Sequence, residues 1–137
     1  MLPPTVGVSE AKDEGDAVID HVVIGVADVA TSRTFYERAL IPLGVGVVLD
    51  LPGYVGFGDQ GRPWFFVAAR EPTQKVHVAF TAPDRPTVDA FHQAALAAGG
   101  VDNGPPGPRP IYHQHYYGGF VLDPDGNNIE AVCHLPG

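Results

Sequence analysis

The chain has 137 residues, a formal net charge of -8, 45% hydrophobic residues and 18% charged residues. These values predict one ordinary domain with a core, and they argue against a fully disordered chain and against binding to nucleic acid phosphates. No apolar run reaches the roughly 18 residues that span a membrane, and no secretory signal pattern is present, so we expect a cytoplasmic protein. The single cysteine, Cys133, argues against an intrachain disulfide and a cysteine-based zinc site.

The first half of the chain alternates between strand and helix patterns. Residues 1–17 have no hydrophobic period and predict an acidic N-terminal tail. Asp28 is a candidate N-cap for a helix that Pro42 and Gly44 end. Short apolar runs predict strands over residues 19–26, 45–51, 54–58 and 64–69.

The second half repeats this alternation. Asp84 is a second candidate N-cap, and Gly99-Gly100 ends the helix that follows it, with His92 on the helix surface. The Pro/Gly-rich residues 103–110 predict a loop. Strands are predicted over residues 76–80, 116–122 and 128–134, the last two joined by a hairpin turn at residues 123–127.

The two halves are related by a repeat with a constant offset of 56 residues. This offset places His21 on His77 and, in the helices, Phe35 on Phe91. The repeat is too long and too few in number for a solenoid. It predicts an α+β domain over residues 18–135, made of two βαβββ modules, 18–70 and 75–135.

The repeat also suggests a metal site. If the modules pair about a pseudo-twofold axis, four equivalent positions converge on that axis: His21, Phe66, His77 and Glu130. Two imidazoles and one carboxylate are the ligands of a 2-His-1-carboxylate site, and a cation would compensate a charged Glu130 in an apolar strand. The alternatives are that Glu130 faces solvent, or that the histidines and Glu130 only pair with each other.

Residues 112–117 hold two His and three Tyr beside the strand of Glu130. If the turn pairs Leu122 with Asn128, Tyr116 and Phe120 share the face of Glu130. A slip of one residue would present Tyr117 and His115 instead. Any of Tyr116, Tyr117 and His115 could serve as a catalytic acid, base or hydrogen-bond donor there, or the segment could simply be a polar-aromatic strand entrance. Trp64, Phe66 and Phe120 could line a substrate pocket, although core packing explains the first two equally well.

The run from Phe120 to Glu130, with its Asp-Pro-Asp-Gly-Asn turn, resembles the vicinal oxygen chelate superfamily, which includes glyoxalases, bleomycin-resistance proteins and extradiol dioxygenases. Asp20-His21-Val22 and the helix phrase at residues 32–37 are also similar to it. The resemblance implies paired βαβββ modules that form a curled mixed sheet around a metal pocket. It also implies ligands at His21, His77 and Glu130, and a homodimer. Phe66 stands where glyoxalase I has a fourth ligand, so true glyoxalase I activity is not expected.

Two functions follow from these patterns. The first is a lyase, isomerase or dioxygenase that uses a divalent metal (Fe, Mn, Zn, Ni or Mg) and a small substrate that chelates the metal through vicinal oxygens. The second is a metal-free binding module that sequesters a cationic, antibiotic-like ligand, which the acidic composition would suit. Both histidines are retained in this chain, and that favours the enzyme.

Overall fold

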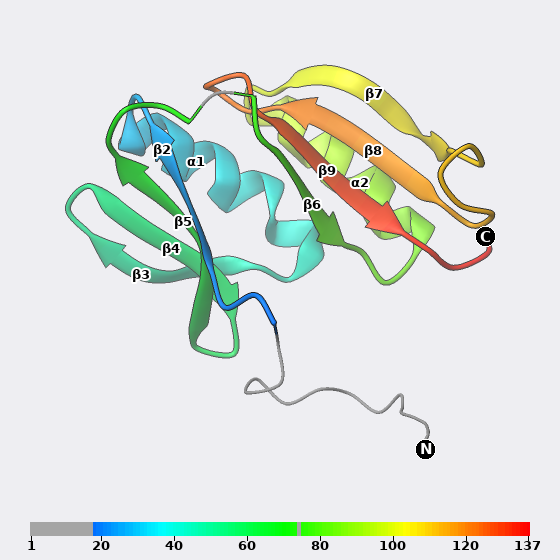
Figure 1. Cartoon of the computed structure of the whole chain (residues 1–137), viewed down its shortest axis with the longest axis horizontal. Helices are drawn as coiled ribbons and strands as arrows, with labels where there is room; N and C mark the ends of the chain where they lie inside the picture. Colours follow the sequence, from blue (N-terminus) through cyan, green and yellow to red (C-terminus); the bar gives the residue numbers. More distant parts are fainter. Residues whose placement is uncertain (1–17, 74) are drawn as a thin grey trace.

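The computed structural model describes residues 18–73 and 75–137 (Figure 1). These residues form two four-stranded mixed sheets and two α-helices, which confirms the predicted α+β class. The predicted acidic tail, residues 1–17, lies outside the described residues. No helix in the described part is long and apolar enough to cross a membrane.

The first module has the strand order β2-β5-β4-β3. Its first strand is parallel to β5, and the other neighbours are antiparallel. Its elements are β2 (Val22–Val26), α1 (Val29–Ala39), the 3-10 helix η2 (Ile41–Leu43), β3 (Gly46–Leu51), β4 (Tyr54–Asp59) and β5 (Arg62–Ala69).

The second module repeats this topology with the order β6-β9-β8-β7, and β6 is parallel to β9. Its elements are β6 (His77–Thr81), α2 (Arg85–Ala97), β7 (Val101–Pro108), β8 (Tyr117–Leu122) and β9 (Asn128–Cys133). The duplicated βαβββ pattern is therefore present. Within the described residues no ladder joins the two sheets, so one chain does not close them around a pocket.

Both helices begin where the sequence predicts. The Asp28 side chain accepts hydrogen bonds from the N–H groups of Ala30 and Thr31, at 3.0 and 3.3 Å. The Asp84 side chain accepts one from Thr87, at 2.9 Å. Each carboxylate satisfies N–H groups that have no partner inside the helix, which is the usual role of an N-cap.

Two expectations for the second module were wrong. Residues 103–110 were predicted to be a loop, but β7 covers most of them. This strand lies at the sheet edge, where proline needs no partner for its missing N–H, and its register with β8 shifts twice. His92 is buried, with 8% exposure, and a carboxylate oxygen of Asp102 lies 3.0 Å from its Nε2 and gives the buried nitrogen a partner.

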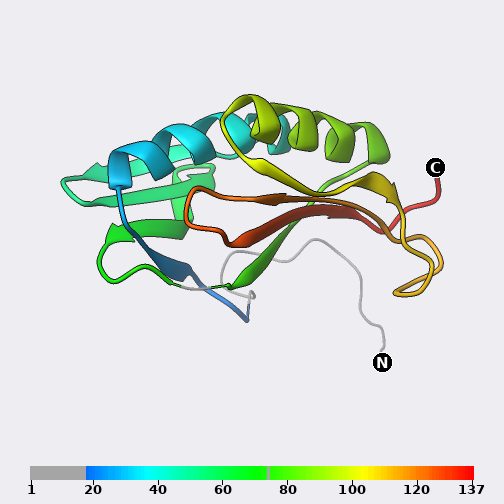
Figure 2. The ribbon, with the colours of Figure 1, turned by 90° about the horizontal axis from the view of Figure 1, so that it is seen from above.

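One continuous core joins the modules on the side of the helices. Both helices lie on the same side of the sheets (Figure 2), and buried residues of both modules form one hydrophobic cluster. The rings of Phe65 and Phe80, one from each module, meet edge to face at 5.4 Å. The opposite face of each sheet carries no helix (Figure 2).

The turn between β8 and β9 ties the modules together. The buried Tyr36 of α1 donates its O–H to Asp123 at 2.5 Å, and the same carboxylate accepts the N–H groups of Asp125 and Asn127. The Asn127 amide oxygen in turn accepts the N–H of Val76. The motif that carries the family resemblance therefore has a structural role.

Candidate functional site

A fully buried carboxylate marks the helix-free face of the second module. Glu130 lies in the middle of β9, and its side chain is 1% exposed. Ile129 and Ala131, on either side of it, belong to the core, so alternation turns Glu130 to the opposite face. The alternative of a solvent-facing Glu130 is therefore wrong.

Two polar side chains hold this carboxylate. Nε2 of His77, on the neighbouring β6, lies 2.7 Å from Oε1 of Glu130. The Tyr116 hydroxyl donates a hydrogen bond to the other oxygen, Oε2. A buried charge is tolerated only with such partners, so the three residues form one polar unit. His77 itself is half exposed and opens this unit to solvent.

Glycine at position 118 makes room for this unit. A Cβ there would lie 2.8 Å from Oε2 of Glu130 and 3.0 Å from a ring carbon of Tyr116. The first distance is shorter than carbon and oxygen normally approach without strain. The polar unit therefore depends on a position that carries no side chain.

The register of the β8–β9 hairpin is the one that the turn predicts. Leu122 pairs with Asn128 and Phe120 with Glu130. Phe120 consequently lies on the face of Glu130, with its ring 6.1 Å from that of His77. Tyr116 precedes the strand and reaches the same face.

The alternative register is not observed. The Tyr117 hydroxyl donates to Asp89 of α2 at 2.7 Å, so Tyr117 lies on the helix side, away from Glu130. His115 lies in the turn before β8, where its N–H donates to Nδ1 of His113. Tyr117 does not contribute to the polar unit because side chains alternate between the two faces of the strand. His115 lies outside the strand and does not contribute to it either.

The environment of Tyr116 determines how it can act. Burial and the hydrogen bond to Glu130 raise the pKa of its phenol well above the usual range. At neutral pH the side chain is thus a protonated donor. It can orient Glu130 or donate a hydrogen bond, and it is poorly suited to remove a proton.

His21 lies in the first module with a carboxylate of its own. Its Nδ1 is 2.8 Å from Oδ1 of Asp20, and Arg62 bonds the other Asp20 oxygen at 3.2 Å. The hydrogen bond with His21 lowers the pKa of the exposed Asp20. A carboxylate at Nδ1 favours the tautomer that leaves the lone pair on Nε2, which is the arrangement of many metal-binding histidines.

The aromatic residues predicted to line a pocket are divided between the modules. Phe66 meets the His21 ring edge to face at 5.6 Å and stacks on Tyr54 at 5.0 Å. Trp64 packs against Phe80 of the other module, with ring centres 5.9 Å apart. Phe66 is therefore the neighbour of the predicted ligand His21, while Phe120 is the neighbour of the predicted ligand His77.

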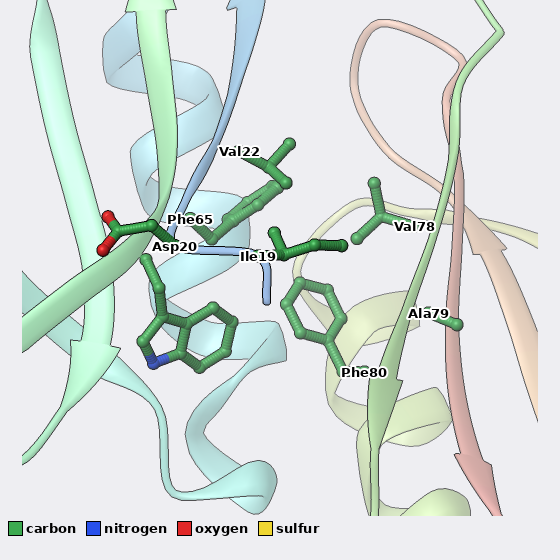
Figure 3. Close-up of a pocket in the computed structure, with 8 residues that line it drawn as sticks. Ile19, Asp20, Val22, Phe65, Val78, Ala79 and Phe80 are labelled. Atoms are coloured by element: carbon green, nitrogen blue, oxygen red, sulfur yellow. The ribbon is translucent and has the colours of Figure 1, made fainter. Parts of the chain in front are cut away.

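A cleft of about 220 Å³ lies between the edge strands β2 and β6 (Figure 3). Ile19, Val22 and Phe65 form one wall, and Val78 and Phe80 form the other. Asp20 also lines the cleft, and its carboxylate points away from β6 (Figure 3). This space separates the two modules at the edges where the sheets do not pair.

The predicted metal ligands thus form two separate halves. His77 and Glu130 are in contact, whereas His21 stands with Asp20 and Phe66 on the other module. Across residues 18–73 and 75–137, no three His, Cys, Asp or Glu side chains are grouped so that they could hold a metal ion.

Two residues near these halves were given no functional role by the sequence patterns. Asp20 could have been found, since it directly precedes a predicted ligand. Arg109 could not, because it falls in a segment that was predicted to be a loop; its guanidinium carbon lies 5.5 Å from the centre of the Phe120 ring.

Known proteins of one family share this architecture. A model of the Glyoxalase/Bleomycin resistance protein/Dioxygenase superfamily matches residues 18–131. A glyoxalase/bleomycin resistance protein from Albidiferax ferrireducens T118 is 29% identical with a TM-score of 0.77, over 85% of this chain and 99% of that one. Lactoylglutathione lyase from Agrobacterium tumefaciens is 20% identical with a TM-score of 0.64, over 86% of this chain and 93% of that one, and shows a similar fold.

A glyoxalase I mutant from Zea mays also shows a similar fold, at 24% identity and a TM-score of 0.61. The match covers 83% of this chain but 45% of the maize chain. Comparison with curated protein sequences gives no match. The repeat, the fold and the match over residues 18–131 agree, and the chain belongs to the Glyoxalase/Bleomycin resistance protein/Dioxygenase superfamily.

Proposed function

We propose that this chain is a divalent-metal-dependent enzyme whose small substrate binds the metal through two neighbouring oxygens. The observation that carries the proposal is the buried Glu130, held by Nε2 of His77 at 2.7 Å on a face that no helix covers. An ionised carboxylate at such a position is costly for a purely structural role, and paired ionisable groups of this kind are concentrated at functional sites.

The residues fit a hard or intermediate divalent cation. Imidazole nitrogen and carboxylate oxygen suit Fe, Mn, Zn, Ni or, less well, Mg. His77 and Glu130 would supply two ligands, and His21 would supply the third. When bound, the metal would polarise the substrate oxygens as a Lewis acid or provide a site for dioxygen.

A homodimer would bring the two halves together. One chain separates His21 from His77 and Glu130, and the sheet edges β2 and β6 carry no ladder partner on their outer sides within the described residues. In a twofold dimer, His21 of one copy can face His77 and Glu130 of the other, which generates two equal sites. We place this dimer in the cytoplasm, with a small molecule as its substrate.

The remaining residues of the site have separate roles in this proposal. Tyr116 keeps the Glu130 carboxylate in place with its single O–H. Phe66 can neither ligate a metal nor accept a proton, so the proton transfer of glyoxalase I is not expected at this position. Trp64 and Phe120 would supply apolar walls.

The first experiment is metal analysis of protein purified without chelator. We expect stoichiometric divalent metal in the wild type and its loss in His77→Ala, because one of three ligands is removed. His113→Ala is the matched control, since His113 is exposed and does not contact Glu130, and it should keep the metal. A folded wild-type protein without metal after exposure to each of the five cations would refute the enzyme proposal. Binding of a cationic glycopeptide by that metal-free protein would then favour the sequestration alternative.

A further inference from the structure

Arg109 holds a defined position beside the polar unit of Glu130. The backbone N–H of Arg109 donates a hydrogen bond to the carbonyl of Tyr116 at 2.8 Å. Arg109 therefore lies at the start of the loop that joins β7 to β8. Its side chain folds back along β7, and Nη2 donates to the carbonyl of Pro105 at 2.7 Å. The guanidinium carbon lies 5.5 Å from the centre of the Phe120 ring, a cation–π distance.

The composition of β7 makes this position possible. A Cβ at Gly107 would lie 3.1 Å from Nη1 of Arg109, and one at Gly104 would lie 3.0 Å from a ring carbon of Phe120. Gly104 also has a φ of +148°, which side-chain-bearing residues rarely adopt. The glycines therefore leave room for the guanidinium to lie along the strand, and the proline at position 105 still offers its carbonyl as an acceptor.

The guanidinium shares a face with the predicted metal ligands. Phe120 pairs with Glu130 across the β8–β9 ladder, and its ring is 6.1 Å from that of His77. Arg109 and His77 thus both lie beside the Phe120 ring. A small molecule bound at His77 could reach Arg109 across that ring.

Arg109 carries a positive charge that no described carboxylate neutralises. Arg33 and Arg62 form ion pairs with Asp50 and Asp20, at 2.9 and 3.2 Å. For Arg109, the partners within the described residues are two backbone carbonyls, those of Pro105 and Pro108. These carbonyls take up two of the five N–H groups of the guanidinium, so donors remain for a ligand. This cationic group stands in a chain whose net charge is -8.

We propose that Arg109 binds the carboxylate of a planar organic acid, the substrate class of the proposed enzyme, while Phe120 contacts the planar part of that molecule. A guanidinium matches a carboxylate through two parallel hydrogen bonds. An aromatic ring beside it favours a flat, unsaturated ligand. The identification of this ligand as a substrate rests on the proposed function, but its binding does not. A cationic ligand is disfavoured, because Arg109 would repel it.

Three probes of one shape and different charge test this proposal. Benzoate, benzamide and benzamidinium carry charges of -1, 0 and +1 on the same ring. Their affinities for the full chain are measured by calorimetry or ligand-observed NMR in the presence of EDTA, so that a metal cannot attract the anion. We expect benzoate to bind at least about tenfold more tightly than benzamide, the usual effect of a charge-assisted hydrogen bond, and benzamidinium to bind most weakly.

The Arg109→Gln variant should abolish this preference, and Arg33→Gln, which removes a charge elsewhere, should preserve it. Arg109→Lys keeps the charge without the two-pronged geometry, and we expect an intermediate preference. If Arg109→Gln does not fold, Arg109→Lys decides: an unchanged preference would overturn the proposal. Equal affinities for the three probes in the wild type, including no measurable binding of any, would overturn it too.

The same series separates this proposal from that of the metal enzyme. His77→Ala should lose metal but keep the benzoate preference in EDTA, because Arg109 is unchanged. A wild type that binds no metal and still prefers benzoate would refute the metal proposal alone. A wild type that binds metal but shows no charge preference would refute the role of Arg109 alone.

Discussion

The buried bond between Tyr36 and Asp123 offers a direct test of how the modules are held together. Tyr36→Phe removes one hydroxyl and leaves the ring packing unchanged. The lost bond is 2.5 Å long and buried, and it joins a phenol to a carboxylate. A hydrogen bond to a charged group contributes about 1.5–3 kcal/mol.

The remaining partners of Asp123 place the expected effect in the lower half of that range. Asp125 and Asn127 still donate to the carboxylate after the substitution, so its charge is not left without partners. We therefore expect Tyr36→Phe to lower the free energy of unfolding by about 1.5–2 kcal/mol. For a domain of this size the melting temperature should fall by about 5–10 °C.

Urea unfolding followed by circular dichroism measures this loss. An unchanged slope of the unfolding free energy against urea concentration would show that the denatured state is not altered. Tyr112→Phe is the matched control, because Tyr112 is 65% exposed. It should change the stability by less than about 0.5 kcal/mol. A Tyr36→Phe effect no larger than that of the control would refute the view that the turn motif links the modules.

Three further substitutions test other parts of the account. Gly118→Ala should displace the Glu130 carboxylate, because the new Cβ would lie 2.8 Å from Oε2, and metal content should fall while the circular dichroism spectrum is kept; full metal content would contradict this. Asp20→Asn should weaken metal binding by about tenfold or more through loss of the carboxylate that orients His21, as measured by competition with a chelator, and an unchanged affinity would argue against that role. Asp84→Ala should lower the melting temperature at neutral pH. The hydrogen bonds with Thr87 lower the pKa of Asp84 in the folded state. The stability that Asp84 contributes is therefore fully present above the pKa of Asp84 in the unfolded chain. It is lost as the pH falls through the lower pKa of Asp84 in the folded chain. The difference between wild type and variant should therefore shrink below pH 3.8, and a gap that persists at lower pH would count against it.

Much of the fold could be predicted because local signals and the repeat agree. The N-caps Asp28 and Asp84 and the turn at residues 123–127 all fall where the structure has them. Strand β7 was missed because Pro and Gly normally signal a loop, whereas at a sheet edge with two register shifts they can still pair. His92 was misplaced because a histidine in a helix does not reveal its distant partner, Asp102.

The site could be predicted only in part. The repeat identified His77 and Glu130, and the turn gave the register that places Phe120 beside them. The position of His21 relative to them depends on how whole modules pack, and a repeat within one chain contains no information on that. Arg109 lies beside the Phe120 ring after a strand with register shifts, so the role proposed for it could be inferred only from the folded structure.

In the proposed dimer each of the two metal sites takes ligands from both copies, and mixing of variants tests this most directly. His21→Ala and His77→Ala should each hold little metal alone. When the two are unfolded and refolded together, half of the dimers should be mixed, and each mixed dimer should regain one intact site. We predict a metal content per chain of about a quarter of the wild type. A mixture of His77→Ala with Glu130→Gln, whose changes lie in the same half, should recover none. If the mixture of His21→Ala with His77→Ala holds no more metal than the two variants do separately, a site shared between two chains is contradicted.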